Sequence, residues 1–124
     1  MADKTIADFL AGKSAHTIEL YEHFIAVFQT IGVIEVSAAK TMIGVSNTHK
    51  RIAWITQFGK NFIHAVFPFS KPHSDNLCFT KIAQVPGTEQ YNHHFRMLYK
   101  DDVNDEVMGF IRLAYEEKDE NFSV

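Results

Sequence analysis

The N-terminal third of the chain carries apolar residues at helical spacing. Between Ser14 and Gly32 they recur every three or four positions, and polar residues such as Glu22 and Gln29 fall mostly between them. Ser14 is a residue type that caps helix N-termini, and Gly32 is one that ends helices. The pattern therefore predicts a long amphipathic helix with one buried face, preceded by one or two helical turns at residues 5–10.

After Gly32 the apolar period changes from 3.6 residues to two, which is the alternation of a strand with one buried face. Short polar segments interrupt this pattern, so we expect an antiparallel meander. The predicted strands are residues 33–36, 41–46, 50–58 and 61–69.

The central hairpin of this meander is predicted from the Gly-Lys pair at residues 59–60. A two-residue type II′ turn places glycine at its first position, because that position needs a positive φ. The turn would set Phe58 opposite Asn61 and Ile55 opposite His64.

The C-terminal part changes period twice. Apolar residues recur every third position over residues 79–85, which predicts a short helix or turn, and residues 91–99 alternate as a further strand. Asp101 or Asp102 is expected to cap a last helix whose apolar stripe includes Phe110 and Ile111. The chain is thus predicted to be a single α+β domain, a two-layer sandwich whose antiparallel sheet of about five strands has helices mainly on one face. Residues 5–118 should fold, and residues 119–124 should form a flexible tail.

Alternation also sorts the side chains of the predicted sheet between its two faces. The face expected to pack on the helices collects Thr41, Ile43, Val45, Ile52, Trp54, Thr56, Ile63, Ala65 and Phe67. The opposite face gathers cationic or titratable side chains, namely Lys40, Arg51, His64, His94 and Arg96. Arg and Lys supply charge and donors, so these five residues are the candidate site for an anion. The competing interpretation is a set of solvated side chains, which a one-residue slip in register would disperse.

Composition limits the partners that the chain can take. Its 124 residues are 46% hydrophobic and 22% charged, as expected for a globular protein with its own core. The net charge of −3 argues against broad capture of nucleic acid, so nucleic acid is a less favoured partner than an anionic small molecule or a protein. Neither a signal-peptide pattern nor a long apolar run occurs, which predicts a cytoplasmic protein without a membrane partner.

Known reaction chemistries find little support in the sequence. Cys78 is the only cysteine and has apolar neighbours, so we expect an inert, buried thiol. Among the seven histidines, His93 and His94 should face opposite sides of a strand, and His16 and His23 are about two helical turns apart, so no metal site is predicted. Phosphate-loop, dinucleotide and hydrolase motifs are absent, so we expect no cofactor and assign no catalytic residue.

Four short segments of the chain form a recognisable set, namely Phe9-Leu-Ala-Gly-Lys-Ser, Ala39-Lys-Thr-Met-Ile-Gly, Arg51-Ile-Ala-Trp-Ile and Asn92-His-His-Phe-Arg-Met. Together they resemble a small bacterial family catalogued as a domain of unknown function. The similarity covers nearly the whole chain. Members of the family occur alone and fused to endonuclease-like or transport-labelled proteins, which implies a fold and leaves the activity open. The family's Lys-Thr pair falls here on Lys40 and Thr41, and its His-Phe-Arg element on residues 94–96.

Three interpretations of the function remain open at this point. The first is a non-catalytic binding module that recognises an anionic group through the mixed sheet face. A small hydrolase or transferase is the second, with His64 or His94 as acid or base beside Lys40 and Arg96. The third is a homodimer that covers an apolar patch on the same face, formed by Met42, Ile55, Phe62 and Val66.

Overall fold

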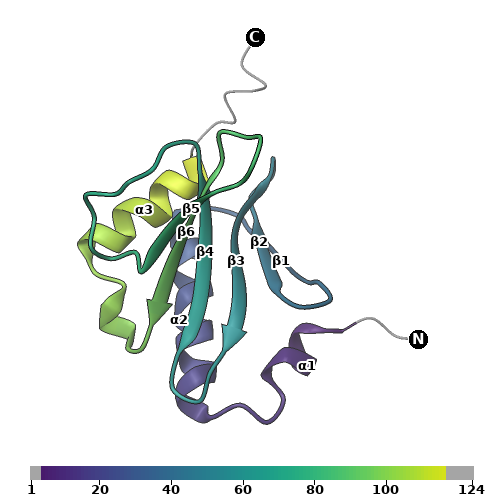
Figure 1. Cartoon of the computed structure of the whole chain (residues 1–124). Helices are drawn as coiled ribbons and strands as arrows, with labels where there is room; N and C mark the ends of the chain where they lie inside the picture. Colours follow the sequence, from purple (N-terminus) through teal and green to yellow (C-terminus); the bar gives the residue numbers. More distant parts are fainter. Residues whose placement is uncertain (1–3, 117–124) are drawn as a thin grey trace.

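An antiparallel sheet of six strands, in the order β1-β2-β3-β4-β6-β5, organises the fold of this computed structural model (Figure 1). The structure describes residues 4–116, so the predicted tail at residues 119–124 lies outside the described residues. The strands are β1 Glu35–Ala38, β2 Ile43–Ser46, β3 Arg51–Phe58, β4 Ile63–Phe69, β5 Lys81–Gln84 and β6 Tyr91–Met97. Strands β1 to β4 begin one or two residues after the positions predicted from the alternation, and β6 begins at its predicted position. Strand β5 was not predicted as a strand.

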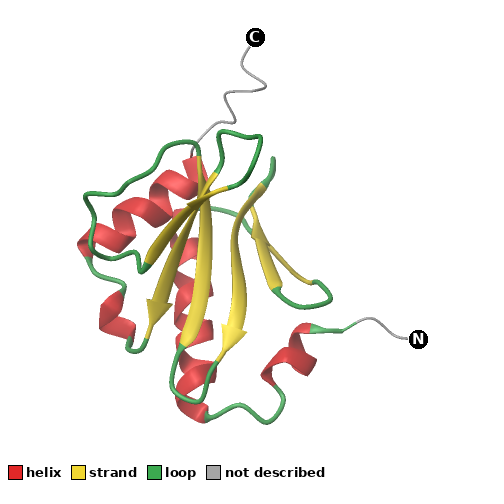
Figure 2. Ribbon diagram, viewed as in Figure 1, coloured by secondary structure: helices red, strands yellow, loops and turns green. Residues whose placement is uncertain are grey.

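Helices α2 and α3 lie against one face of this sheet, and Figure 2 shows no helix in front of β3 and β4. The helices are α1 Ile6–Leu10, α2 Ala15–Ile31, the 3-10 helix η1 Lys100–Asp102 and α3 Asp105–Glu116. Ser14 caps α2 as predicted, since its hydroxyl accepts a hydrogen bond of 3.1 Å from the backbone N–H of Thr17. Asn104 caps α3 through the N–H of Val107, whereas the carboxylate of Asp102 accepts from residues that precede η1.

Phenylalanine rings fill the layer between the helices and the sheet. Phe67 of β4 is fully buried, with its ring centroid 6.0 Å from that of Phe24 and 6.4 Å from that of Phe28 on α2. Full burial of one such side chain stabilises the fold by about 1.5–3 kcal/mol. The α+β prediction is confirmed, with six strands in place of about five.

The additional strand comes from the segment predicted as a short helix or turn. Residues 81–84 form β5, an edge strand whose Ile82 pairs with His93 of β6. The apolar period of three arose because Phe79 precedes the strand and packs on Phe69 and Phe110, 6.4 and 4.8 Å away between ring centroids. Phe79 thus belongs to the loop, and only four residues of the segment form the strand.

The hairpin between β3 and β4 differs from the predicted type II′ turn. Phe58 pairs with Ile63, and the N–H of Gly59 donates to the oxygen of Phe62 at 2.8 Å, so the turn contains four residues. Within the described residues, positive φ angles occur at Gly12 and Gly87 and not at Gly59. Glycine is needed at position 59 for a steric reason, because the Phe62 ring occupies the space that a Cβ would take.

Two β-bulges in β3 change the faces on which its residues lie. One falls between Arg51 and Ala53 and the other between Ile55 and Gln57. As a result Ala53 and Ile55 are fully buried under the helices. The prediction of the core face is confirmed for six residues, namely Ile43, Val45, Ile52, Ile63, Ala65 and Phe67. It is wrong for Trp54 and Thr56, and also for Thr41, which is exposed in the β1–β2 turn.

Candidate functional site

The face of the sheet opposite α2 and α3, which we term the open face, carries two rows of paired residues. One row crosses five strands and holds Gly44, Trp54, Val66, His94 and Lys81. The next row holds Gln57, His64 and Arg96. Directly opposed residues of an antiparallel sheet share a face, so these side chains all lie on the open face.

Two histidines meet between these rows. The Nε2 atom of His64 lies 2.9 Å from Nδ1 of His94, and both side chains are partly buried. A hydrogen bond between two imidazole nitrogens requires one to donate and the other to accept. The neutral pair, or the pair with one added proton, satisfies this requirement, and a doubly protonated pair does not.

Burial and neighbouring positive charge both favour the neutral form of this pair. Burial lowers the pKa of His64, and the nearby His94 and Arg96 lower it further. Burial also lowers the pKa of His94, with a further contribution from Lys81 on β5. The neutral form of both rings is therefore favoured at pH 7, and Arg96 and Lys81 lie beside them on β6 and β5.

The guanidinium of Arg96 is exposed and packs on an aromatic ring. Its Cζ lies 4.6 Å from the ring centroid of Phe62, a cation–π contact. Phe62 in turn lies against Gly59, and the backbone oxygen of Gly59 accepts a 2.7 Å hydrogen bond from the Thr17 hydroxyl. The N-terminus of α2 thus fixes the turn on which Arg96 rests.

Charge is distributed unevenly between the sheet and the rest of the chain. Strands β2 to β6 contain Arg51, Lys81, Arg96 and three histidines, and they contain neither aspartate nor glutamate. Within residues 4–116, neither Lys81 nor Arg96 forms an ion pair with a carboxylate. The open face is consequently cationic in a chain whose net charge is −3.

The structure brings three of the five predicted site residues together and separates the other two. His64, His94 and Arg96 are neighbours on β4 and β6. Lys40 is exposed in the turn between β1 and β2. Arg51 begins β3 at the opposite end of the sheet, where its Nε lies 3.2 Å from the hydroxyl of Ser46.

Lys81 belongs to the site and was missed by the sequence prediction. It pairs with His94 at the start of β5, on the open face. Residues 81–84 read polar, apolar, apolar, polar, so this short edge strand carries no two-residue alternation that could have revealed it.

His93 points to the opposite face, as predicted from its adjacency to His94. Its side chain is fully buried, with ring centroids of Phe69 and Phe79 at 4.8 and 4.9 Å. Nδ1 lies 2.8 Å from the oxygen of Tyr91, and Nε2 accepts a 3.0 Å hydrogen bond from the N–H of His73. This pattern fits a neutral ring protonated on Nδ1, which attaches the β4–β5 loop to β6.

Other chemical groups offer less for recognition. Burial raises the pKa of the Cys78 thiol to about 11, with a further contribution from Glu106, so the thiol stays protonated at neutral pH. The residues that the structure describes contain no group of three or more His, Cys, Asp or Glu side chains placed to hold a metal ion.

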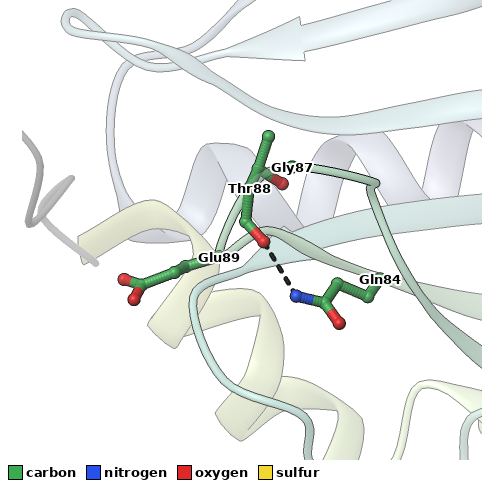
Figure 3. Close-up of a pocket in the computed structure, with 4 residues that line it drawn as sticks. All are labelled: Gln84, Gly87, Thr88 and Glu89. Atoms are coloured by element: carbon green, nitrogen blue, oxygen red, sulfur yellow. Dashed lines mark hydrogen bonds between the residues drawn. The ribbon is translucent and has the colours of Figure 1, made fainter.

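A hollow lies at the β5–β6 turn (Figure 3). It is lined by Gln84, Gly87, Thr88 and Glu89, and the amide of Gln84 donates to the backbone oxygen of Thr88 at 2.9 Å. Its only charged lining residue is an acid, so this hollow does not suit an anion. It also lies at the opposite end of β5 from Lys81.

Comparison with known proteins identifies the family to which the domain belongs. The family model described as a domain of unknown function, DUF5655, matches residues 6–118. The chain belongs to the DUF5655 family. This confirms the resemblance to a domain of unknown function, and the DUF5655 description states no activity. No curated protein and no solved structure matches the chain. Among its described residues, no helix is both long and apolar enough to cross a membrane.

Proposed function

We propose that this domain is a non-catalytic binding module that recognises an anionic group at its open face. The observation that carries the proposal is the hydrogen-bonded His64–His94 pair, which lies between Arg96 and Lys81 on strands that contain no carboxylate. Cations that have no counter-ion among residues 4–116 favour an anionic ligand, because it would supply the balancing charge.

Each side chain has a specific role in this proposal. Arg96 is permanently charged and presents a planar set of donors that suits a carboxylate or phosphate. Lys81 adds a second charge from the edge strand. The imidazole pair donates to the anion and takes up a proton when the anion binds, because a nearby negative charge raises the pKa of both rings. Affinity should therefore increase as the pH falls from 8 to 6.

The ligand that we favour is an anionic small molecule or the acidic group of a partner protein. A cytoplasmic location, a bacterial origin and fusion to other domains stay predictions from the sequence. The apolar patch that would support a homodimer loses one of its members, because Ile55 is fully buried under the helices. Catalysis is also less favoured, since Lys40, one of the cations expected beside the acid or base, lies in the β1–β2 turn.

The proposal is tested by anion titration with charge-matched variants. Thermal-shift screening of phosphate, sulfate and small carboxylates would select a ligand, and calorimetry would then measure its dissociation constant. Arg96→Gln and Lys81→Gln should each weaken binding about tenfold, as expected for the loss of one charge-assisted hydrogen bond. Lys40→Gln removes the same charge from the β1–β2 turn and should leave affinity unchanged.

Two results would contradict the proposal. One is a screen in which no anion stabilises the domain. The other is an affinity that falls equally in the Lys40→Gln control, since this would indicate a response to net charge without a defined site.

A further inference from the structure

The single tryptophan of the chain lies on the open face beside the proposed anion site. Trp54 is partly buried and pairs with Gly44 on one side and Val66 on the other. The ligand inferred from Trp54 is a specific case of the proposed anion binding, and the inference rests on that proposed function. Aromatic side chains on an uncovered sheet face are a common platform for stacking nucleobases.

The neighbours of Trp54 on the open face are a cation on one side and an apolar residue on the other. Position 44 has no side chain, and a Cβ there would lie 2.5 Å from Cζ of Arg51. The Arg51 guanidinium therefore lies across Gly44, next to Trp54. On the other side Val66 separates Trp54 from His94, so the backbones of these two residues are two strands, or roughly 10 Å, apart, and His64 lies on the strand between them.

This spacing matches a ligand that joins a flat ring to an oxyanion through a short linker. We infer that the open face takes a mononucleotide, with its base stacked on Trp54 and its phosphate between Arg96 and the His64–His94 pair. Val66 provides an apolar floor between the two ends, where the sugar would lie. The base supplies a planar surface for the indole, and the phosphate supplies the charge that the strands lack.

The overall charge favours a single nucleotide over a long strand. A polynucleotide gains affinity through many phosphate contacts and is repelled by a net negative protein. The chain has a net charge of −3, and its two arginines on the open face are at opposite ends of the sheet. The cluster around Arg96 can therefore neutralise a single phosphate group.

Trp54 provides its own signal for the experiment, because it is the only tryptophan. Adenosine 5′-monophosphate should quench its fluorescence and bind about tenfold tighter than ribose 5-phosphate, which has the same phosphate and no base. Calorimetry should show that Trp54→Leu removes this difference and that Trp54→Phe, which keeps a ring, retains most of it. Arg96→Gln should weaken both ligands by the same factor. Circular dichroism would verify that each variant is folded.

The outcomes separate this inference from the proposed function. If ribose 5-phosphate binds as tightly as the nucleotide and Trp54→Leu changes neither, the inference is wrong and anion binding stands. If neither ligand binds at Arg96, both are wrong. A single-stranded hexanucleotide that binds at least a hundredfold tighter than the mononucleotide, and loses that advantage in Arg51→Gln, would overturn the mononucleotide in favour of a nucleic-acid strand.

Discussion

The hydroxyl of Thr17, buried in the first turn of α2, donates a 2.7 Å hydrogen bond to the backbone oxygen of Gly59 in the β3–β4 turn. This contact connects the helix layer to the turn that carries Phe62, and Phe62 supports Arg96. The position of the principal cation of the candidate site therefore depends on a buried threonine on the other side of the sheet.

Replacing Thr17 by valine should destabilise the domain by about 1–3 kcal/mol. The substitution keeps the side-chain volume and leaves the Gly59 oxygen without its donor. Chemical denaturation would measure the loss. Thr30→Val is the matched control, because Thr30 lies on the same helix, is exposed, and donates only within its own turn to Val27. An equal loss in both variants would show that the contact with the turn is not what Thr17 contributes.

Gly59→Ala should also destabilise the fold and displace the Phe62 ring. The added methyl group would occupy space that the ring fills, and such overpacking typically costs about 1–3 kcal/mol. Gly109→Ala is the opposite case, because it lies within α3 with open space around it and should be stabilising by roughly 0.5–1 kcal/mol. Thermal unfolding of the two variants should therefore shift in opposite directions.

The turn at Gly59 also shows where sequence reasoning succeeds and where it fails. Apolar alternation identified β2, β3, β4 and β6, because each has a buried face under the helices. It could not locate the bulges in β3, since a bulge is set by pairing with the neighbouring strands and leaves no period of its own. Because of this error the sequence prediction placed Trp54 in the core. Trp54 lies on the open face and is the residue that best suggests a ligand.

The alternation of side chains predicted the face more reliably for the site residues on β4 and β6. His64, His94 and Arg96 share a face because the β4–β6 pairing is regular over seven residue pairs. Arg51 lies on the predicted face but at the other end of the sheet, and Lys40 lies in the β1–β2 turn, outside any strand. Alternation assigns a face to each residue and does not show how far apart two residues are along the strands. Lys81 was missed because an edge strand of four residues has too short a pattern.

Truncation of Ile111 should destabilise α3 more than truncation of its neighbour Phe110. Ile111 is fully buried, and Ile→Ala at such a site costs about 2–5 kcal/mol. Phe110 belongs to the same predicted apolar stripe, but it is only partly buried, with its ring centroid 4.8 Å from that of Phe79 and 5.8 Å from that of Phe69. Phe110→Ala should therefore cost less than the 3–5 kcal/mol of a fully buried ring. Denaturation midpoints in the reverse order would show that the loop aromatics, and not the sheet core, hold α3.

The stability of the domain should fall as the pH drops below about 6.5, the ordinary pKa of histidine. Burial lowers the pKa of His93 in the folded state, although its hydrogen bond to the Tyr91 oxygen opposes this shift. The unfolded chain then takes up a proton at a higher pH than the folded chain does. Stability is consequently complete above the unfolded pKa and is lost as the pH falls through the folded pKa.

The same proton should release the β4–β5 loop, because a protonated His93 can no longer accept the N–H of His73 at Nε2. His64 and His94 contribute to acid destabilisation with the same sign, since burial lowers the pKa of each. Urea denaturation at several pH values between 5 and 8 measures the slope. His93→Gln should reduce this slope, because it removes the buried imidazole. An unchanged slope in His93→Gln would mean that the buried imidazole is not the group that titrates on unfolding.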